Sequence, residues 1–301
     1  MSDSVHAESA TVIARPGTGG FSFWFSVAGA FVLLAIIYAQ PMREMYRNWG
    51  LVDSYYSHGY LIAPISLYLV WLKRDDLARI PRSSSPLGYL FIIGSGVILL
   101  LGSFLGFAIF QQFSFVPMLA GISLVFLGRE QTKALWFPIA FLLLMIPMPG
   151  SVTQSIVFDL KMLAAELAVR LAQLMTLPMV HEGSFIRFKD DALLVGNVCG
   201  GLRSLIALLA VGALMAYFSQ SRSWARWLVV ALSGPIAIAA NVFRIFILCL
   251  VGYFWGSDVA GGTFHDVSGL FIFAIAFVLF FSLEAALRKV APMAASEEAS
   301  S

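Results

Sequence analysis

The chain has 301 residues, of which 59% are hydrophobic and only 12% are charged, and its mean hydropathy is +0.86. A water-soluble globular domain carries about a quarter charged residues, so the composition excludes an ordinary soluble enzyme, a disordered chain and a coiled coil. The net charge of +2 is too small to indicate a nucleic-acid-binding surface, and two cysteines are too few for a disulfide scaffold.

The apolar residues fall in long blocks separated by short polar loops, which predicts an all-α polytopic membrane protein. Residues 21–289 are expected to form one transmembrane domain between two disordered cytoplasmic tails, 1–20 and 290–301. The candidate membrane-spanning runs, eight in number, are 21–40, 58–72, 86–106, 107–127, 134–149, 201–218, 224–255 and 264–287. The run 224–255 is too long for one straight helix, and we expect it to break or kink at Gly234-Pro235.

Residues 152–175 differ from the spans. Hydrophobic side chains recur there at three- and four-residue spacing, while charged side chains occupy other faces. This pattern predicts an amphipathic helix that lies at the membrane interface. After it, residues 184–188 and 192–198 flank Lys189-Asp190-Asp191, which predicts a small hairpin before the sixth span.

The basic residues predict the orientation. With a cytoplasmic N-terminus and eight alternating spans, eleven of the 19 Lys and Arg residues fall on the cytoplasmic side and six on the other. This bias places both termini in the cytoplasm. It also places Cys199 and His265 at the outer ends of their spans, and Arg244 about 16 Å below the outer end of its own. These residues are far apart in sequence, yet we expect them to meet near the outer leaflet, as the parts of a catalytic site must.

Cys199 lies at a predicted helix start and is followed by Gly200 and Gly201. The free N–H groups and the dipole of a helix start favour a thiolate, and the glycine N–H groups are candidates for stabilising an oxyanion. The alternative is a small buried hydrophobic residue. We give that interpretation to Cys249, which has no polar neighbour in the sequence.

Arg244 is the strongest single signal. A charge within an apolar span costs at least about 3 kcal/mol, so the guanidinium needs a partner or a wet cavity. Asn241 lies one turn earlier on the same face. Arg203, four residues after Cys199 on the same predicted helix face, is the second candidate for the positive charge. The alternative for Arg244 is a structural ion pair with a carboxylate.

Two histidines are predicted on the outer side. His265 lies between Thr263 and Asp266, which have capping-box spacing, so the eighth helix is expected to begin here. The dipole there favours neutral imidazole, the form that a general base needs. The alternative is an interfacial histidine bonded to lipid headgroups or water. His58 is a candidate substrate-binding residue, although the tyrosines around it also fit an aromatic interface belt.

No metal-ligand spacing joins the cysteines and histidines, and no nucleotide-binding or hydrolase motif is present. We therefore expect neither a metal nor a cofactor.

Five segments, taken in order and together, resemble the exosortases, which are membrane-embedded cysteine enzymes related to the archaeosortases. The resemblance covers residues 21–287. One departure is Gly200, since the family usually has Ser or Ala after the cysteine. The segments are Tyr56-Ser57-His58-Gly59-Tyr60, Met145-Ile146-Pro147-Met148-Pro149, Val198-Cys199-Gly200-Gly201-Leu202-Arg203-Ser204-Leu205, Pro235-Ile236-Ala237-Ile238-Ala239-Ala240-Asn241-Val242-Phe243-Arg244-Ile245 and Phe264-His265-Asp266-Val267-Ser268-Gly269.

The resemblance implies a cysteine protease or transpeptidase of the bacterial inner membrane with its active site facing the periplasm. Its substrates would be exported proteins with a C-terminal Pro-Glu-Pro motif, one transmembrane helix and a basic tail. Such enzymes often accompany exopolysaccharide and biofilm loci. The family's catalytic residues map onto Cys199, Arg244 and His265. Our candidate substrate-binding residues are Arg203, Asn241, His58, Gly200 and Gly201.

Two other functions stay open from the sequence. In a transporter or flippase for a lipid-linked saccharide, Arg244 would line a substrate path beside the Gly-Pro pair. In a non-enzymatic assembly subunit, Arg244 would pair with a partner helix. Neither function needs thiol chemistry. The partners expected in every case include the lipid bilayer and exclude nucleic acid.

Overall fold

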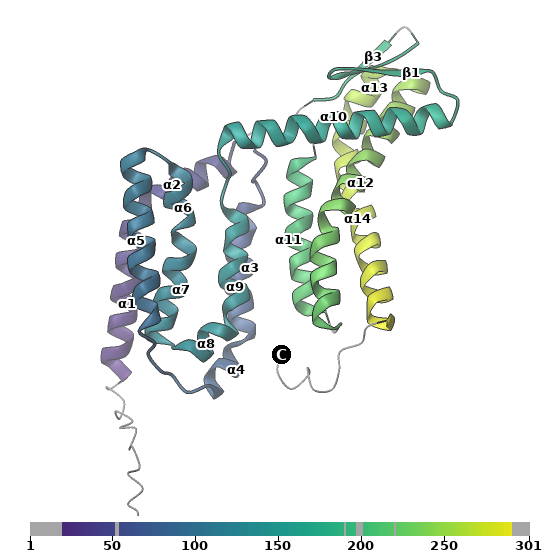
Figure 1. The fold of residues 1–301 in the computed structure, drawn as a ribbon. Coiled ribbons are helices and arrows are strands. Elements are labelled where there is room, and N and C mark those ends of the chain that lie inside the picture. Colours follow the sequence, from purple (N-terminus) through teal and green to yellow (C-terminus); the bar gives the residue numbers. More distant parts are fainter. Residues whose placement is uncertain (1–19, 52–53, 190, 197–200, 220, 291–301) are drawn as a thin grey trace, which may run out of the picture. The chain divides into compact units, whose positions relative to one another are not determined.

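The computed structural model describes residues 20–51, 54–189, 191–196, 201–219 and 221–290 (Figure 1). The chain divides into two units after Gln40. The described part of the first unit is mainly α1 (Gly20–Ile37), which contains no charged residue. The predicted tails lie outside the described residues except at their inner ends, Gly20 and Val290. All contacts discussed below lie within the second unit.

The second unit begins within α2 and runs to the C-terminal helix. Its first half consists of α2 (Ala39–Trp49), α3 (Gly59–Leu72), α4 (Arg74–Arg79), α5 (Leu87–Leu105), α6 (Ala108–Phe113), α7 (Phe115–Phe126), α8 (Arg129–Ala134), α9 (Trp136–Phe141) and the 3-10 turn η1 (Leu142–Met145). Its second half consists of α10 (Gly150–Leu174), β1 (Met179–Glu182), β2 (Phe185–Phe188), β3 (Asp191–Leu194), α11 (Leu202–Phe218), α12 (Ser223–Trp255), α13 (Ser257–Gly261) and α14 (Thr263–Val290).

The helices confirm a multi-pass α-helical membrane protein. Among the described residues, four helices are long and apolar enough to cross a bilayer. The number of candidate spans rises to six if each of two bent helix pairs counts as one span. Two further apolar helices, α3 and α11, are shorter. Each of the eight predicted runs falls on one of these helices or bent pairs, but helix length alone does not establish eight crossings. The number eight therefore stays a prediction.

The predicted divisions of the two longest apolar runs have different outcomes. α5 ends at Gly106, whose φ of 72° suits a glycine, so the division of 86–127 there is confirmed. By contrast, α12 runs through Pro235 as one helix of 33 residues, so the expectation of a break is wrong, whereas the kink expected as the alternative stays a prediction. The buried side chains Val229 and Ala237 on either side of the proline pack in one cluster with α11 and α14, which favours a continuous helix.

α10 lies nearly at right angles to the helical segment before it. The angle between Trp136–Met145 and Gly150–Leu174 is 84°, and the four residues between them include Pro147 and Pro149. Such an angle suits a helix that follows a spanning segment and then runs along the membrane surface. Leu163 and Leu171 of the predicted apolar stripe are exposed. Ile156, Leu160 and Leu167 of the same stripe are half-buried against the core clusters, so only part of the stripe faces out of the protein and the interfacial position stays a prediction.

A three-stranded antiparallel sheet follows α10, in the order β1-β2-β3. The predicted hairpin is confirmed as β2 and β3, with Phe188 opposite Asp191. The sequence analysis missed β1, whose Met179 pairs with Phe188. Four residues directly after a long helix gave too short an alternating pattern to be recognised.

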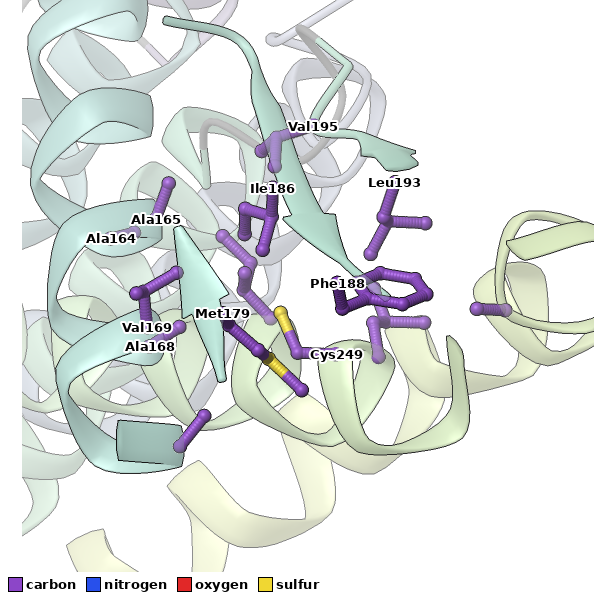
Figure 2. Close-up of a cluster of buried hydrophobic side chains, with 14 of the residues drawn as sticks. Ala164, Ala165, Ala168, Val169, Met179, Ile186, Phe188, Leu193, Val195 and Cys249 are labelled. Carbon is purple, nitrogen blue, oxygen red and sulfur yellow. The ribbon is translucent and has the colours of Figure 1, made fainter. Parts of the chain in front are cut away.

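One face of the sheet packs on α10 and α12. Ile186 and Phe188 lie in a buried cluster with Cys249 of α12 and with alanines of α10 (Figure 2). These α10 alanines are Ala164, Ala165, Ala168 and Ala172. Alanine has the smallest side chain that still favours a helix, so this face lets the sheet and α12 approach α10 closely.

Asp191 fastens the sheet to α13. Its carboxylate accepts hydrogen bonds from the backbone N–H and the hydroxyl of Ser257, each at 2.9 Å. The bonds from Ser257, followed by one from the N–H of Ala192, lower the pKa of Asp191 below its ordinary value. The sheet and α13 therefore lie at the same end of the bundle of α11, α12 and α14, beside the start of α14 (Figure 1).

The packing of α5 on α7 generates a prediction about stability. A Cβ atom at Gly121 would lie 2.8 Å from Ile92 Cγ1 and 2.9 Å from the Gly88 carbonyl oxygen, whereas one at Gly94 would meet nothing within 4 Å. We expect Gly121→Ala to lower the free energy of unfolding by about 1–3 kcal/mol through overpacking. Gly94→Ala should leave stability unchanged or raise it, since alanine favours a helix. Thermal unfolding in detergent measures both, and equal shifts would contradict the close approach.

Candidate functional site

The start of α11 lies directly against α12. Gly201 is the N-cap of α11 and has a φ of 74°, a conformation that favours glycine. A Cβ atom on Gly201 would lie 2.6 Å from Nδ2 of Asn241, so the backbone of Gly201 is in contact with that amide. Asn241 is buried. Two of the predicted substrate-binding residues, 40 positions apart in the sequence, are therefore neighbours.

Arg244 joins α12 to α14. Its Nε donates a hydrogen bond to Oγ of Ser268 at 2.9 Å. Ser268 is only 5% exposed, and it lies three residues after His265 in the same helix. Arg244 in turn lies three residues after Asn241. Residues 241–244 of α12 therefore contact both Gly201, directly before α11, and Ser268 in the first turns of α14.

Ser268 is not among the candidate residues predicted from the sequence. It lies within the segment that resembles the exosortases, Phe264 to Gly269, but a single serine at a helix start is common and carries no specific signal. Only the packing of α12 on α14 identifies it as a partner of Arg244.

The structure describes part of the predicted catalytic set. Cys199 and Gly200 lie outside the described residues. The backbone of His265 belongs to α14, which begins at Thr263 as the capping-box spacing predicts. The side chain of His265 is likewise outside what is described, so the meeting of the three catalytic groups stays a prediction.

Arg203, the second candidate for the positive charge, anchors a loop. Its Nε donates to the Ser54 carbonyl oxygen at 2.7 Å, which ties α11 to the segment before α3. Tyr56 lies two residues after Ser54 and belongs to the same buried cluster as Leu202 of α11. The segment that contains His58 is therefore packed beside the start of α11.

His58 and Tyr56 carry buried polar atoms. Nε2 of His58 lies 3.1 Å from the Leu144 carbonyl oxygen and must be the protonated nitrogen, since a carbonyl only accepts. Nδ1 of His58 and the hydroxyl of Tyr56 have no hydrogen-bond partner within the part of the chain that the structure describes. Tyr56 is only 6% exposed, so it does not belong to an interface belt, whereas Tyr60 is exposed.

The corner between η1 and α10 is fixed by contacts from the region between the end of α2 and the start of α3. Trp49 Nε1 donates to the Met145 carbonyl oxygen at 2.9 Å, next to the Leu144 carbonyl that His58 contacts. Tyr56 of the His58 motif and Met145 of the Met145 to Pro149 motif also lie in one buried cluster, so the two motifs are packed together. Together with Arg203, these contacts bring three of the five family-like segments to one region.

Lys161 is buried, although the sequence analysis placed it on a charged face of the amphipathic helix. It is 6% exposed, and its Nζ donates to Oγ of Ser184 at 3.0 Å. The available signal was its spacing, because Lys161 precedes Ala164, Ala165 and Ala168 by three, four and seven residues and so shares their face.

Cys249 has the structural role that the sequence predicts. It is fully buried in the cluster between α12, α10 and the sheet (Figure 2). Over the described ranges, which omit Cys199, no group of three His, Cys, Asp or Glu side chains is arranged to hold a metal ion.

The fold and the site define a multi-pass helical membrane protein with a polar cluster where α11, α12 and α14 meet. A model of the transmembrane exosortase family matches residues 49–282. This is 234 of the 301 residues, and the chain belongs to that family. Membership makes it a membrane-embedded transpeptidase of the protein-sorting type in general. No curated protein and no solved structure matches the chain.

The contact between Gly201 and Asn241 generates the second prediction. We expect Gly201→Ala to destabilise the protein, because the φ of 74° costs an L-residue about 1–2 kcal/mol and the new methyl group would collide with the amide. The matched control is Gly196→Ala, at a position with open space on the other side of Cys199. Thermal unfolding compares the two, and adding Asn241→Ala should recover part of the loss. Equal stability of both glycine variants would contradict the contact.

Proposed function

We propose that this protein is a cysteine protease or transpeptidase that cleaves the C-terminal sorting signal of exported proteins through a thioester. The observation that carries the proposal is the Arg244–Ser268 hydrogen bond, which links α12 to the helix of His265. The contact between Gly201 and Asn241 supports it from the other side, two residues after Cys199. Family membership supports the class of chemistry.

In the proposed reaction, the Cys199 sulfur attacks the carbonyl carbon of the scissile peptide bond. The S–C bond forms, the C–N bond breaks, and His265 passes the thiol proton to the departing amine. An amine, a hydroxyl group or a water molecule then attacks the carbonyl carbon of the thioester. This second step releases the acyl product and returns a proton to the sulfur, so the enzyme is unchanged at the end.

Arg244 supplies the positive charge in this proposal. Its guanidinium either stabilises the thiolate or the oxyanion, or it pairs with the acidic residue of the sorting motif. The Nε–Ser268 bond fixes one edge of the guanidinium plane. Arg203 is the weaker candidate, because its Nε is bound to the Ser54 carbonyl.

The proposed substrates carry a short Pro-Glu-Pro motif, one transmembrane helix and a basic tail. A basic tail stays in the cytoplasm, so the motif would emerge on the periplasmic side of the inner membrane, where the charge bias places Cys199 and His265. The link to exopolysaccharide and biofilm production belongs to the same proposal. Candidate contacts to the motif are His58 and Asn241, both near the start of α11.

The first test is substitution of the nucleophile. Cys199→Ala and Cys199→Ser should each abolish processing of a tagged reporter that carries the sorting signal, because neither provides a thiolate. Cys249→Ala is the control: that cysteine is buried in an apolar cluster, so processing should persist with at most lower protein yield. The readout is the size shift of the reporter on a gel. Normal processing by both Cys199 variants would favour the transporter or assembly-subunit functions instead.

The second test concerns the guanidinium. Arg244→Lys keeps the charge but loses the planar fork, so we expect at least a tenfold loss of processing rate, equivalent to about 1.4 kcal/mol. Ser268→Ala removes the acceptor for Nε and should have a smaller effect in the same direction. Single-turnover thioester formation separates these effects from folding defects. Full activity of Arg244→Lys would show that only a positive charge is needed.

A further inference from the structure

A groove of about 640 Å³ lies between α5, α7 and α9, away from Arg244 and Ser268. Almost all of its wall is apolar and comes from several helices. The wall includes Phe91 and Ile98 of α5, Val116, Ala120 and Leu124 of α7, and Ile139 of α9. Phe91 and Ile98 are exposed, so the groove opens onto the outer surface of the helices, where a membrane protein meets lipid.

One end of the groove is polar and basic. Arg129, Thr132 and Lys133 of α8 line it together with Trp136 of α9. Their spacing of three to four residues places them on one face. Arg129, Lys133 and Trp136 are all exposed. Lys133 pairs with Glu130 at 2.9 Å, but an ion pair exposed on both sides is weak and open to competition from another anion.

The surroundings of this end are positive as well. Gln131 Nε2 donates to the carbonyl oxygens of Leu77 and Ile80, which holds the segment after α3 against α8. Residues 73–85 and 128–135 together contain six Lys and Arg residues and three Asp and Glu residues. The basic excess attracts an anion to the same level as the exposed tryptophan, a residue that favours the headgroup region.

We propose that this groove binds an acidic glycerophospholipid, with its acyl chains along α5, α7 and α9 and its phosphate at Arg129 and Lys133. The apolar wall suits hydrocarbon, and the basic end suits a negative headgroup. A transmembrane helix with a basic tail is the competing occupant. Its tail would bring positive charge to a positive end, so charge complementarity favours the lipid. This inference does not depend on the proposed function.

The test measures lipid preference by native mass spectrometry of the full chain released from nanodiscs of equal phosphatidylglycerol and phosphatidylcholine. The wild type should retain mainly phosphatidylglycerol. Arg129→Gln with Lys133→Gln should lower the ratio of the two bound lipids by about tenfold. The control is Arg288→Gln with Lys289→Gln, which removes the same charge from exposed residues at the end of α14 that do not line the groove. The control should keep the wild-type ratio.

A second variant tests the apolar wall. Ala120→Phe narrows the groove without changing charge, and it should lower the number of lipids of both kinds that are retained. A native-like unfolding temperature for this variant confirms that it is folded. An unchanged lipid ratio in the Arg129 and Lys133 variant, or an equal fall in the control, would overturn the proposal. Displacement of the lipid by a basic-tailed transmembrane peptide would overturn it in favour of a helix-binding groove.

Discussion

The structure depends on the placement of one guanidinium in an apolar bundle. Arg244 lies far inside α12, and a charge there is tolerated only where polar groups surround it. Its Nε bond to Ser268 provides such a group and fixes the first turns of α14 against the middle of α12. Three residues earlier, Asn241 contacts Gly201 at the start of α11. Arg244 and Asn241 thus lie where three helices meet, and the proposed chemistry uses this place.

Small residues make this arrangement possible. Gly201 lets the α11 start touch an amide, and the alanine face of α10 lets the sheet and α12 pack closely over the end of the bundle. A Cβ atom on Gly201 would already lie 2.6 Å from the Asn241 amide, so a bulkier residue there would force the neighbouring groups to shift. Backbone and methyl contacts around the polar groups of the site therefore act together with their hydrogen bonds.

Two separate groups of hydrogen bonds from side chains to backbone carbonyl oxygens connect the elements of the second unit. In one group, Arg203, His58 and Trp49 bind backbone carbonyl oxygens and hold the segment before α3 against α11 and the corner after η1. In the other, Gln131 holds the segment after α3 against the basic helix α8. The first group lies beside the start of α11, and the second lies at the basic end of the apolar groove. Charged and polar side chains thus gather at the ends of helices whose middles are apolar.

The sequence by itself determined the class of protein, the positions of the apolar runs and the start of α14, because these follow from composition, periodicity and capping residues. It also identified Cys249 correctly as a buried residue. Only the tertiary structure decided that α12 continues through Pro235, that Lys161 is buried with the α10 alanines, that a third strand precedes the hairpin and that Ser268 is the partner of Arg244. The path of α12 and the partner of Ser268 depend on neighbours that are distant in the sequence, while β1 was too short to be recognised and the spacing of Lys161 to the alanines of α10 was a signal that went unused.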